Sequence, residues 1–422
     1  MQVSITAVDG FYGPSHLLST DAWAADRGIA RIAHWVCRSE YCLIQHFQKI
    51  NLEDSILKKA TSFQSLVSTL DDPRQHAKVL YPLDEILLLC LCGVVSGCES
   101  FVDIVEYGGE KLKFLRRLSD FEHGIPSHDT LSTVFRALDP EPFNVVFAQW
   151  AADLSGRIDG RVVAVDGKTV RGSKAGGTTP LHLISAYCND LRLVLGQRAS
   201  AHKKNEIRDI PVLLDLLYLK GAIVTIDAMG CQRSIARKIR DKDADYVLAL
   251  KGNQGNLYED VTLWFEEREH DNTEFFQTVD GDKGRIETRS YSQCEDIDWL
   301  RERHPDWADL TSIGRVISTR EVDRKTTTQI RYFISSLPLD VKRFAHAVRS
   351  HWGIENRLHW VLDMTFRDDD SRVRKDQAPK NFAVIKHMAM NLLNKAKDKK
   401  SLRVMRKKAG WNNRYLLQIL GV

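Results

Sequence analysis

Two short apolar runs in the sequence each end in an aspartate. The runs are "RVVAVDG" (161–167) and "GAIVTIDAMG" (221–230), and the acids are Asp166 and Asp227. Their β-branched residues and flanking glycines predict buried strands. If the strands are neighbours in one sheet, both carboxylates emerge at the same edge, where two like charges are costly unless a cation shares the site. A hairpin is the alternative for the first run, because Asp-Gly is a favoured two-residue turn.

The chain around these runs alternates between strand and helix patterns. "LHLISAYC" (181–188) and "LRLVLGQR" (191–198) have strand character, and helical stretches flank the second aspartate run, which is followed by the strand "DYVLALKGNQ" (245–254). Three strands, then helix, strand, helix and strand, predict an α/β fold: a ribonuclease-H-like mixed sheet covered on both faces. We assign this catalytic domain to residues 160–370, with a β-rich insertion at about 257–338.

The flanking regions have different patterns. Residues 51–150 predict a small helical N-terminal domain, in which "GIPSHDTLSTVFRAL" (124–138) begins at a Ser127 or Asp129 cap. Two interpretations stay open for it: a DNA-binding module of helix-turn-helix type, or a bundle that packs on the next domain. Residues 1–50 have no clean period and are an uncertain N-terminal extension, and residues 371–422 predict a basic C-terminal helical region.

Composition excludes several classes of protein. The 422 residues carry a net charge of only +4, so affinity for a polyanion has to come from local clusters. None of the eight cysteines shows zinc-type spacing, and the longest apolar run, "ILLLCLCGVVSGC" (86–98), is too short to span a bilayer. The N-terminus lacks the order of a signal peptide. These features predict a soluble cytoplasmic protein with reduced cysteines and no membrane partner.

A third acid is expected from a long helix at about 339–364. In "RSHWGIENRLHWVLDMTF" (349–366) Glu355 adjoins an apolar stripe, one turn from His351 and His359. Together with the two aspartates it would make an oxygen-rich site suited to Mg²⁺ or Mn²⁺. Two alternatives are a zinc-binding ladder of the two histidines and the glutamate, although their order is not HExxH, and a solvent-exposed ion pair.

Three motifs occur together in the order of a known family. "VVAVDGKTVRGS", "VTIDAMGCQ" and "RSHWGIENRLHWVLDMTFRDDDSRVR" resemble the DDE transposases of bacterial insertion sequences, most closely the ISAs family and the H-repeat-associated proteins linked to Rhs elements. The resemblance covers about residues 55–395. It implies a ribonuclease-H-like core in which Asp166, Asp227 and Glu355 are the catalytic, metal-binding triad for two Mg²⁺ (or Mn²⁺) ions. The implied activity is cleavage and strand transfer of DNA at the ends of the element.

The region around the glutamate departs from the pattern of related transposases. Those enzymes carry Tyr, Arg and Lys at set distances from it, and here these positions hold Val348, His351 and Leu362. Candidate DNA contacts on this helix are Arg349, His351 and Arg357.

Basic residues elsewhere give further candidate contacts. Lys168, Arg171 and Lys174 follow the first aspartate and are predicted to contact DNA phosphate, the alternative being solvated loop residues. Residues 371–414 hold fourteen Lys and Arg against two Asp, which predicts a DNA-binding face rather than a merely solvated helix.

The tryptophans divide into two groups. Trp352 and Trp360 are expected in the core because they lie eight residues apart on one helix. Candidates to hold a flipped base are Trp264, Trp299 and Trp307, in or beside the insertion.

The expected partners are the element's terminal repeats, target DNA and a second copy of the chain, as a homodimer in a synaptic complex. The protein would act in the bacterial cytoplasm and associate with the nucleoid when bound to DNA. Two other functions stay open. One is a nuclease of the same fold that cuts without joining, and the other is a catalytically silent DNA-binding relative.

Overall fold

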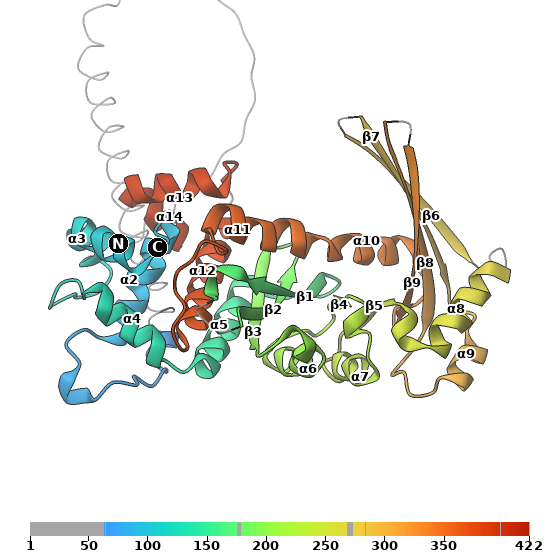
Figure 1. Cartoon of the computed structure of the whole chain (residues 1–422), viewed down its shortest axis with the longest axis horizontal. Helices are drawn as coiled ribbons and strands as arrows, with labels where there is room; N and C mark the ends of the chain where they lie inside the picture. Colours follow the sequence, from blue (N-terminus) through green and yellow to red (C-terminus); the bar gives the residue numbers. More distant parts are fainter. Residues whose placement is uncertain are drawn as a thin grey trace, which may run out of the picture. The chain divides into compact units, whose positions relative to one another are not determined.

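The computed structural model describes residues 63, 65–174, 179–267, 273–282, 284–323, 325–396 and 398–421 (Figure 1). The extension predicted at residues 1–50 lies outside the described residues, as does the start of the predicted helical domain. No helix within the described ranges combines the length and the apolar character needed to cross a bilayer.

The first five strands are β1 (Val162–Val170), β2 (Leu181–Cys188), β3 (Leu193–Ser200), β4 (Ile223–Ile226) and β5 (Asp245–Leu250). They lie in the order β3-β2-β1-β4-β5, with β1 antiparallel to β2 and parallel to β4. The mixed α/β fold and the predicted succession of strands and helices are therefore confirmed. The hairpin alternative is wrong, because Asp166 and Gly167 lie inside β1 and pair in register with β2.

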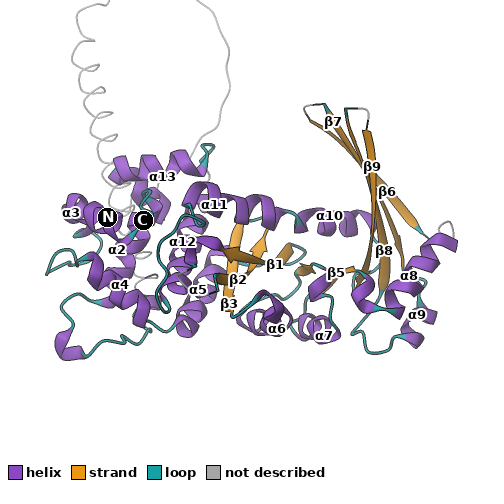
Figure 2. Ribbon diagram, viewed as in Figure 1, coloured by secondary structure: helices purple, strands orange, loops and turns teal. Residues whose placement is uncertain are grey.

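The β-rich segment extends this same sheet. It contains β6 (Glu274–Asp282), β7 (Arg285–Cys294), β8 (Ser312–Val322) and β9 (Lys325–Ser335), all antiparallel. β9 pairs with β5, so the full order runs β3-β2-β1-β4-β5-β9-β8-β7-β6 (Figure 2). This pairing covers the edge that β5 would otherwise expose. Two helices interrupt the strands, α8 (Asn256–Glu267) and α9 (Asp298–Arg303).

Helices cover both faces of the central strands. α6 (Glu206–Leu216) and α7 (Arg233–Asp241) lie on one side, and α10 (Val341–His351) and α11 (Trp360–Phe366) on the other (Figure 1). Successive residues of β1 alternate between the faces. Val163 and Val165 share a core with α6 and α7, whereas Ala164 packs with Ile354 and Leu358 between α10 and α11.

The remaining helices form one packed group. They are α2 (Leu83–Val95), α3 (Phe101–Leu115), α4 (His128–Ala137), α5 (Pro140–Ser155), α12 (Ala378–Lys395), α13 (Leu402–Trp411) and α14 (Asn413–Leu420). Ser127 caps α4, as one of the two predicted caps. α12 packs against α2, α5 and β3, so the C-terminal helices share a core with the N-terminal ones.

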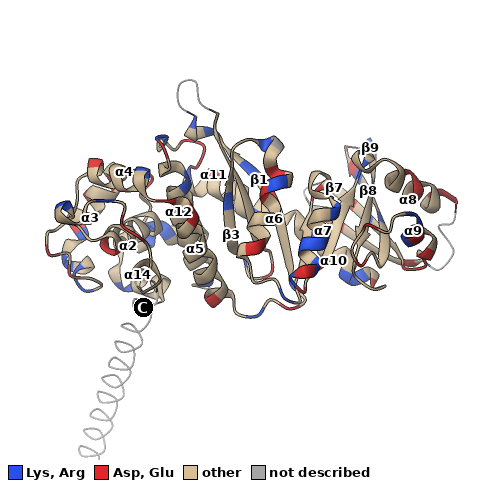
Figure 3. Cartoon of the chain, turned by 90° about the horizontal axis from the view of Figure 1, so that it is seen from below, with Lys and Arg blue, Asp and Glu red and all other residues tan. Residues whose placement is uncertain are grey.

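Burial in this core changes the interpretation of the basic C-terminal region. Lys386 is buried on α12 and pairs with Asp368 at 2.6 Å. Arg406 is also buried and donates hydrogen bonds to the backbone carbonyls of Val94 and Cys98. In the view of Figure 3, positive and negative residues are interspersed over the helices and the sheet. At least these two cations have partners inside the fold and are not displayed to a ligand.

Candidate active site

Asp166 and Asp227 lie side by side where the parallel pairing of β1 and β4 ends, although β1 itself continues to Val170. Val165 of β1 is in register with Ile226 of β4, and each aspartate is the next residue. Because side chains alternate along a strand, Asp166 points to the same face as Ala164, the face covered by α10 and α11. Asp227 ends β4 and accepts hydrogen bonds from the backbone N–H groups of Met229 and Gly230, which fix its orientation.

Glu355 lies on a π-helical segment, Ile354–His359, between α10 and α11. One turn before it, the Nδ1 atom of His351 lies 3.0 Å from the Thr225 hydroxyl on β4. One turn after it, His359 Nδ1 lies 3.7 Å from the Asp166 carboxylate on β1. Residues on either side of Glu355 therefore lie close to both aspartate-bearing strands. π-Helical turns inside α-helices are frequent at functional sites, so the helix predicted at 339–364 is interrupted where its acid lies.

Electrostatics agree with this convergence. The pKa of the Asp166 carboxyl is raised to about 7, chiefly by burial and to a smaller extent by the negative charges of Asp227, Glu355 and Glu206, against the lowering effect of the Gly167 N–H. Nearby like charges disfavour ionisation in this way. The three predicted acids thus come from distant parts of the chain to one electrostatically coupled region.

Two neutral histidines flank the acids. Burial lowers the pKa of His351 to about 4 and that of His359 to about 3, so both rings are uncharged at neutral pH. The Nε2 atom of His359 is buried and has no hydrogen-bond partner among the described residues. An unsatisfied buried nitrogen is costly, and this one belongs to the ring that faces Asp166.

The donor set favours a hard cation, but the ligands are not gathered into a coordination shell. Within the described part of the chain, no three His, Cys, Asp or Glu side chains lie close enough together to hold a metal ion. Carboxylate oxygens are the ligands that Mg²⁺ and Mn²⁺ prefer. The chemistry of the three acids therefore suits the expected ion, and their spacing in this structure is wider than that of bound ligands.

The predicted phosphate contacts have different surroundings. Arg171, Lys174 and Arg349 are exposed, as is Arg357, whose guanidinium lies 3.4 Å from Asn189. Lys168 is only 9% exposed and lies within ion-pair distance of three aspartates. Its ammonium is held inside the protein, so we do not propose Lys168 as a DNA contact.

Two expectations about tryptophan need correction. Trp352 and Trp360 are 39% and 59% exposed, not core residues. Both flank the glutamate turn, beside the stripe of Ile354 and Leu358 that faces the core. Trp264 is buried and unavailable for a flipped base. Trp307 is buried too, and Trp299 is 36% exposed.

The three positions that differ from the pattern of related transposases, Val348, His351 and Leu362, face inward. Val348 and Leu362 are buried in the hydrophobic cores beneath their helices. His351 points at β4 through Thr225.

Sequence reasoning missed a buried pair directly behind Asp166. His182 of β2 hydrogen-bonds Glu206 at the start of α6, and its other ring nitrogen lies 3.0 Å from the Thr169 hydroxyl. A Cβ atom at Gly167 would lie 2.5 Å from the Glu206 carboxylate, so a larger residue there would force the buried His182–Glu206 pair to shift. No spacing in the sequence links these residues, because each lies on a different element.

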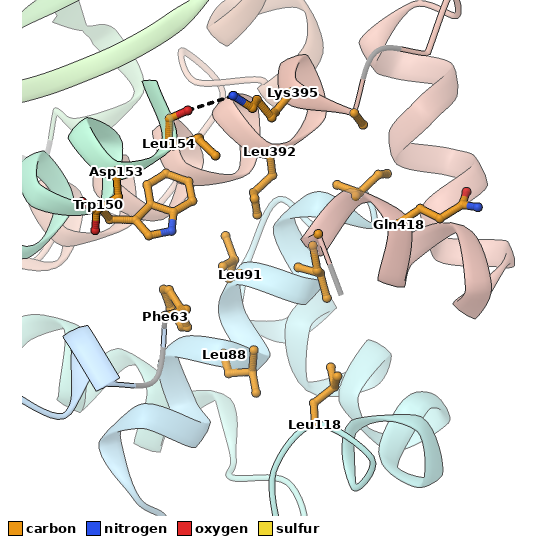
Figure 4. Close-up of a pocket in the computed structure, with 14 residues that line it drawn as sticks. Phe63, Leu88, Leu91, Leu118, Trp150, Asp153, Leu154, Leu392, Lys395 and Gln418 are labelled. Carbon is orange, nitrogen blue, oxygen red and sulfur yellow. Dashed lines mark hydrogen bonds between the residues drawn. The ribbon is translucent and has the colours of Figure 1, made fainter. Parts of the chain in front are cut away.

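An apolar cavity lies elsewhere in the molecule. It has a volume of about 580 Å³ and is lined by residues of the packed helices, among them Leu88, Leu91, Trp150 and Leu392 (Figure 4). None of the candidate site residues lines it. The open edge with the acids, not this cavity, is therefore the candidate active site.

Comparison with known proteins adds an independent finding. Residues 157–392 match the family model described as "Transposase DDE domain", and residues 64–151 match the model of its associated region. The chain is 40% identical over 370 residues to "Putative transposase YncI" of Escherichia coli O157:H7, covering 85% of this chain and 95% of that protein. It is 39% identical over 363 residues to "H repeat-associated putative transposase YhhI" of E. coli K12, covering 84% and 96%.

Two further similarities are more limited. A 68-residue stretch is 47% identical to "Inactive transposase YbfQ" of E. coli K12, covering 16% of this chain and 81% of that protein. Among solved structures, a piggyBac transposase synaptic complex with hairpin DNA aligns with a TM-score of 0.41 and 10% identity, over 84% of this chain and 79% of the other.

Proposed function

Because the chain belongs to the transposase DDE domain family, we propose that it cleaves DNA at the ends of an insertion sequence and joins them to target DNA. The observation that carries this proposal is the convergence of Asp166, Asp227 and Glu355 on one face of the sheet. A ribonuclease-H-like core is supported by the order β3-β2-β1-β4-β5, in which the first acid lies within β1 and the second directly follows its parallel neighbour β4.

The three acids would hold Mg²⁺ or Mn²⁺, as two ions. When bound, such ions supply Lewis acidity that assists in-line displacement at phosphorus. The metal-free cluster is electrostatically unfavourable, as the raised pKa of Asp166 indicates. The acids are thus poised to bind cations, and divalent ions would offset the repulsion among them.

The neutral histidines would orient the acids without adding charge. His351 ties the glutamate-bearing helix to β4, and His359 faces Asp166 across 3.7 Å. Since both rings are desolvated and uncharged, they add no positive charge to compete with a bound cation.

DNA would lie over the exposed side of this helix. The proposed contacts are Arg171 and Lys174 after β1, together with Arg349 and Arg357 on the helix. His351, which the sequence also predicts as a contact, is turned inward against Thr225 of β4 and is left out of the proposed set. Arg349 lies near Arg331, whose guanidinium is 5.4 Å from the Trp352 ring centroid. Trp352 and the more exposed Trp360 would provide aromatic surfaces for bases or sugars beside the scissile phosphate.

The partners would be the terminal repeats of the element, target DNA and a second protomer in the synaptic complex. The reaction would take place in the bacterial cytoplasm, with the protein associated with the nucleoid while bound to DNA.

The test is an assay on duplexes that carry the inverted repeats flanking the gene. We expect cleavage and strand transfer that require Mg²⁺ or Mn²⁺ and disappear in Asp166→Asn, Asp227→Asn and Glu355→Gln. Cleavage without joining would replace the proposal with the nuclease. Metal-independent DNA binding with no cleavage by the unaltered chain would replace it with the silent relative.

A further inference from the structure

A cluster of charged side chains is buried beside the candidate acids. The Lys168 ammonium lies 2.7 Å from a carboxylate oxygen of Asp363, 3.7 Å from Asp368 and 3.6 Å from Asp369. Lys386 of α12 approaches Asp368 from the other side, at 2.6 Å. Lys168, Asp368 and Lys386 are each at least nine-tenths buried. Because removing these charges from water is costly, a contribution to the stability of the fold does not by itself account for their burial.

The position of Lys168 relative to the acids suggests that reason. Lys168 follows Asp166 by two residues on β1 and therefore points to the same face of the sheet. Asp363 lies two turns after Glu355, on the helix that continues the π segment. The ion pair at 2.7 Å thus joins the strand that carries the first acid to the helix that carries the third.

Backbone contacts secure the same junction. The Arg171 N–H donates to the Asp369 carboxylate at 3.0 Å, and Arg374 Nε donates to the Gly172 carbonyl at 2.8 Å. A Cβ atom at Gly172 would lie 2.4 Å from the Asp369 carbonyl oxygen, so the two backbones touch. The end of β1 is therefore fixed to the segment after α11, which leaves the Lys168–Asp363 pair with one geometry.

We propose that Lys168 is a positioning residue, which sets the separation of Asp166 and Glu355 through its ion pair with Asp363. This role rests on the proposed function, because the separation matters only if the acids share metal ions. It differs from the phosphate contact predicted from the sequence, since the ammonium is turned inward to carboxylates. Residues that orient metal ligands from behind typically change metal affinity by about 10- to 100-fold when removed.

The test measures Mn²⁺ binding by the full-length chain without DNA, by calorimetry, together with its melting temperature. Lys168→Met is expected to weaken Mn²⁺ binding by about 10- to 100-fold. Lys168→Arg, which keeps the charge and a donor, is expected to retain most of the affinity. Asp363→Asn should weaken binding to a similar degree, and the double variant should bind no more weakly than either single variant, because both act through one contact.

Lys386→Met is the matched control. It removes a buried lysine from the same cluster that pairs with Asp368 and not with Asp363 of the glutamate-bearing helix, so it should lower the melting temperature while Mn²⁺ affinity changes less than threefold. If Lys386→Met weakens Mn²⁺ binding as much as Lys168→Met does, the effect is general destabilisation and the proposal is wrong. If Lys168→Met does not fold, Lys168→Arg, Asp363→Asn and the control decide in the same way.

Two other outcomes would also overturn it, and they are distinguishable from each other. Unchanged Mn²⁺ affinity in Lys168→Met, with weaker and less salt-dependent DNA binding, would make Lys168 a phosphate ligand and leave the proposed function intact. Mn²⁺ binding by the unaltered chain that persists in Asp227→Asn would show that the acids do not form the metal site. In that case both proposals fall.

Discussion

Asp166→Asn is expected to stabilise the metal-free protein while it abolishes the proposed activity. Asparagine keeps the size of the side chain and an oxygen that accepts hydrogen bonds, but it removes the charge that burial, Asp227 and Glu355 disfavour. Sites whose charges await a ligand commonly carry such a stability cost. The substitution therefore measures how much the buried charge of Asp166 destabilises the fold.

The magnitude follows from the pKa of Asp166, which burial raises from its ordinary value of 3.8 to about 7. A rise of about 3 in pKa corresponds to about 4 kcal/mol between the two protonation states. The folded state binds the proton more tightly than the unfolded state, so this group lowers stability as the pH rises from about 4 to about 7. We expect Asp166→Asn to gain about 2–4 kcal/mol above pH 7, allowing for partial solvent screening, and nothing below pH 4.

The assay is urea unfolding at several pH values in the presence of a chelator, with Asp215→Asn as control. Asp215 is an exposed carboxylate that pairs with Lys238 at the surface, so its removal should change stability by less than about 1 kcal/mol at any pH. Adding Mg²⁺ should then stabilise the unaltered chain and not Asp166→Asn. A loss of stability in Asp166→Asn at pH 8 would refute the reasoning, because it would show that the ionised carboxylate is favourably surrounded.

Three further predictions follow from single features of the structure. Gly167→Ala should lower the free energy of unfolding in urea by about 1–3 kcal/mol through overpacking, because its Cβ would lie 2.5 Å from the buried Glu206 carboxylate. The control Gly109→Ala, where the Cβ would enter open space, should not lower it. Equal effects of the two substitutions would contradict this prediction. Burial lowers the pKa of His359 to about 3 and that of His387 to about 4, so in the Asp166→Asn background, which removes the opposite titration of that carboxyl, stability should fall as the pH drops below about 6.5, where the unfolded rings become charged; a flat acid profile of that variant would contradict it. Trp360→Ala should weaken binding of a single-stranded oligonucleotide about tenfold in calcium buffer, and an unchanged Kd would remove this ring from the DNA surface.

The sequence was sufficient to predict features that depend on local pattern. β-Branched runs ending in Asp166 and Asp227 indicate strands, and neighbouring parallel strands bring their ends together whatever the rest of the chain does. Glu355 was placed correctly on a helix over these strands because the apolar stripe beside it marks the face that packs on the sheet. The metal-binding role of the three acids remains a proposal.

Features that depend on distant partners were not predictable. Nothing near Lys168 in the sequence indicates that Asp363 and Asp368 will surround it, so a buried cation was taken for an exposed one. Helical spacing likewise predicted Trp352 and Trp360 in the core, but spacing does not determine which side of a helix faces the sheet, and both side chains are exposed. Lys386 is buried because of the way α12 packs, and the count of charged residues over 371–414 could not show that some of them are buried.

The central claim is that three acids from distant parts of the chain hold divalent cations against DNA. Its most direct test is a crystal structure of the full-length chain with Mn²⁺ and a duplex carrying the terminal repeat, with the ions located by anomalous scattering. We predict anomalous peaks within ligand distance, about 2.0–2.4 Å, of carboxylate oxygens of Asp166, Asp227 and Glu355. Ions bound elsewhere, or Glu355 remaining out of reach of ions held by the two aspartates, would contradict the account.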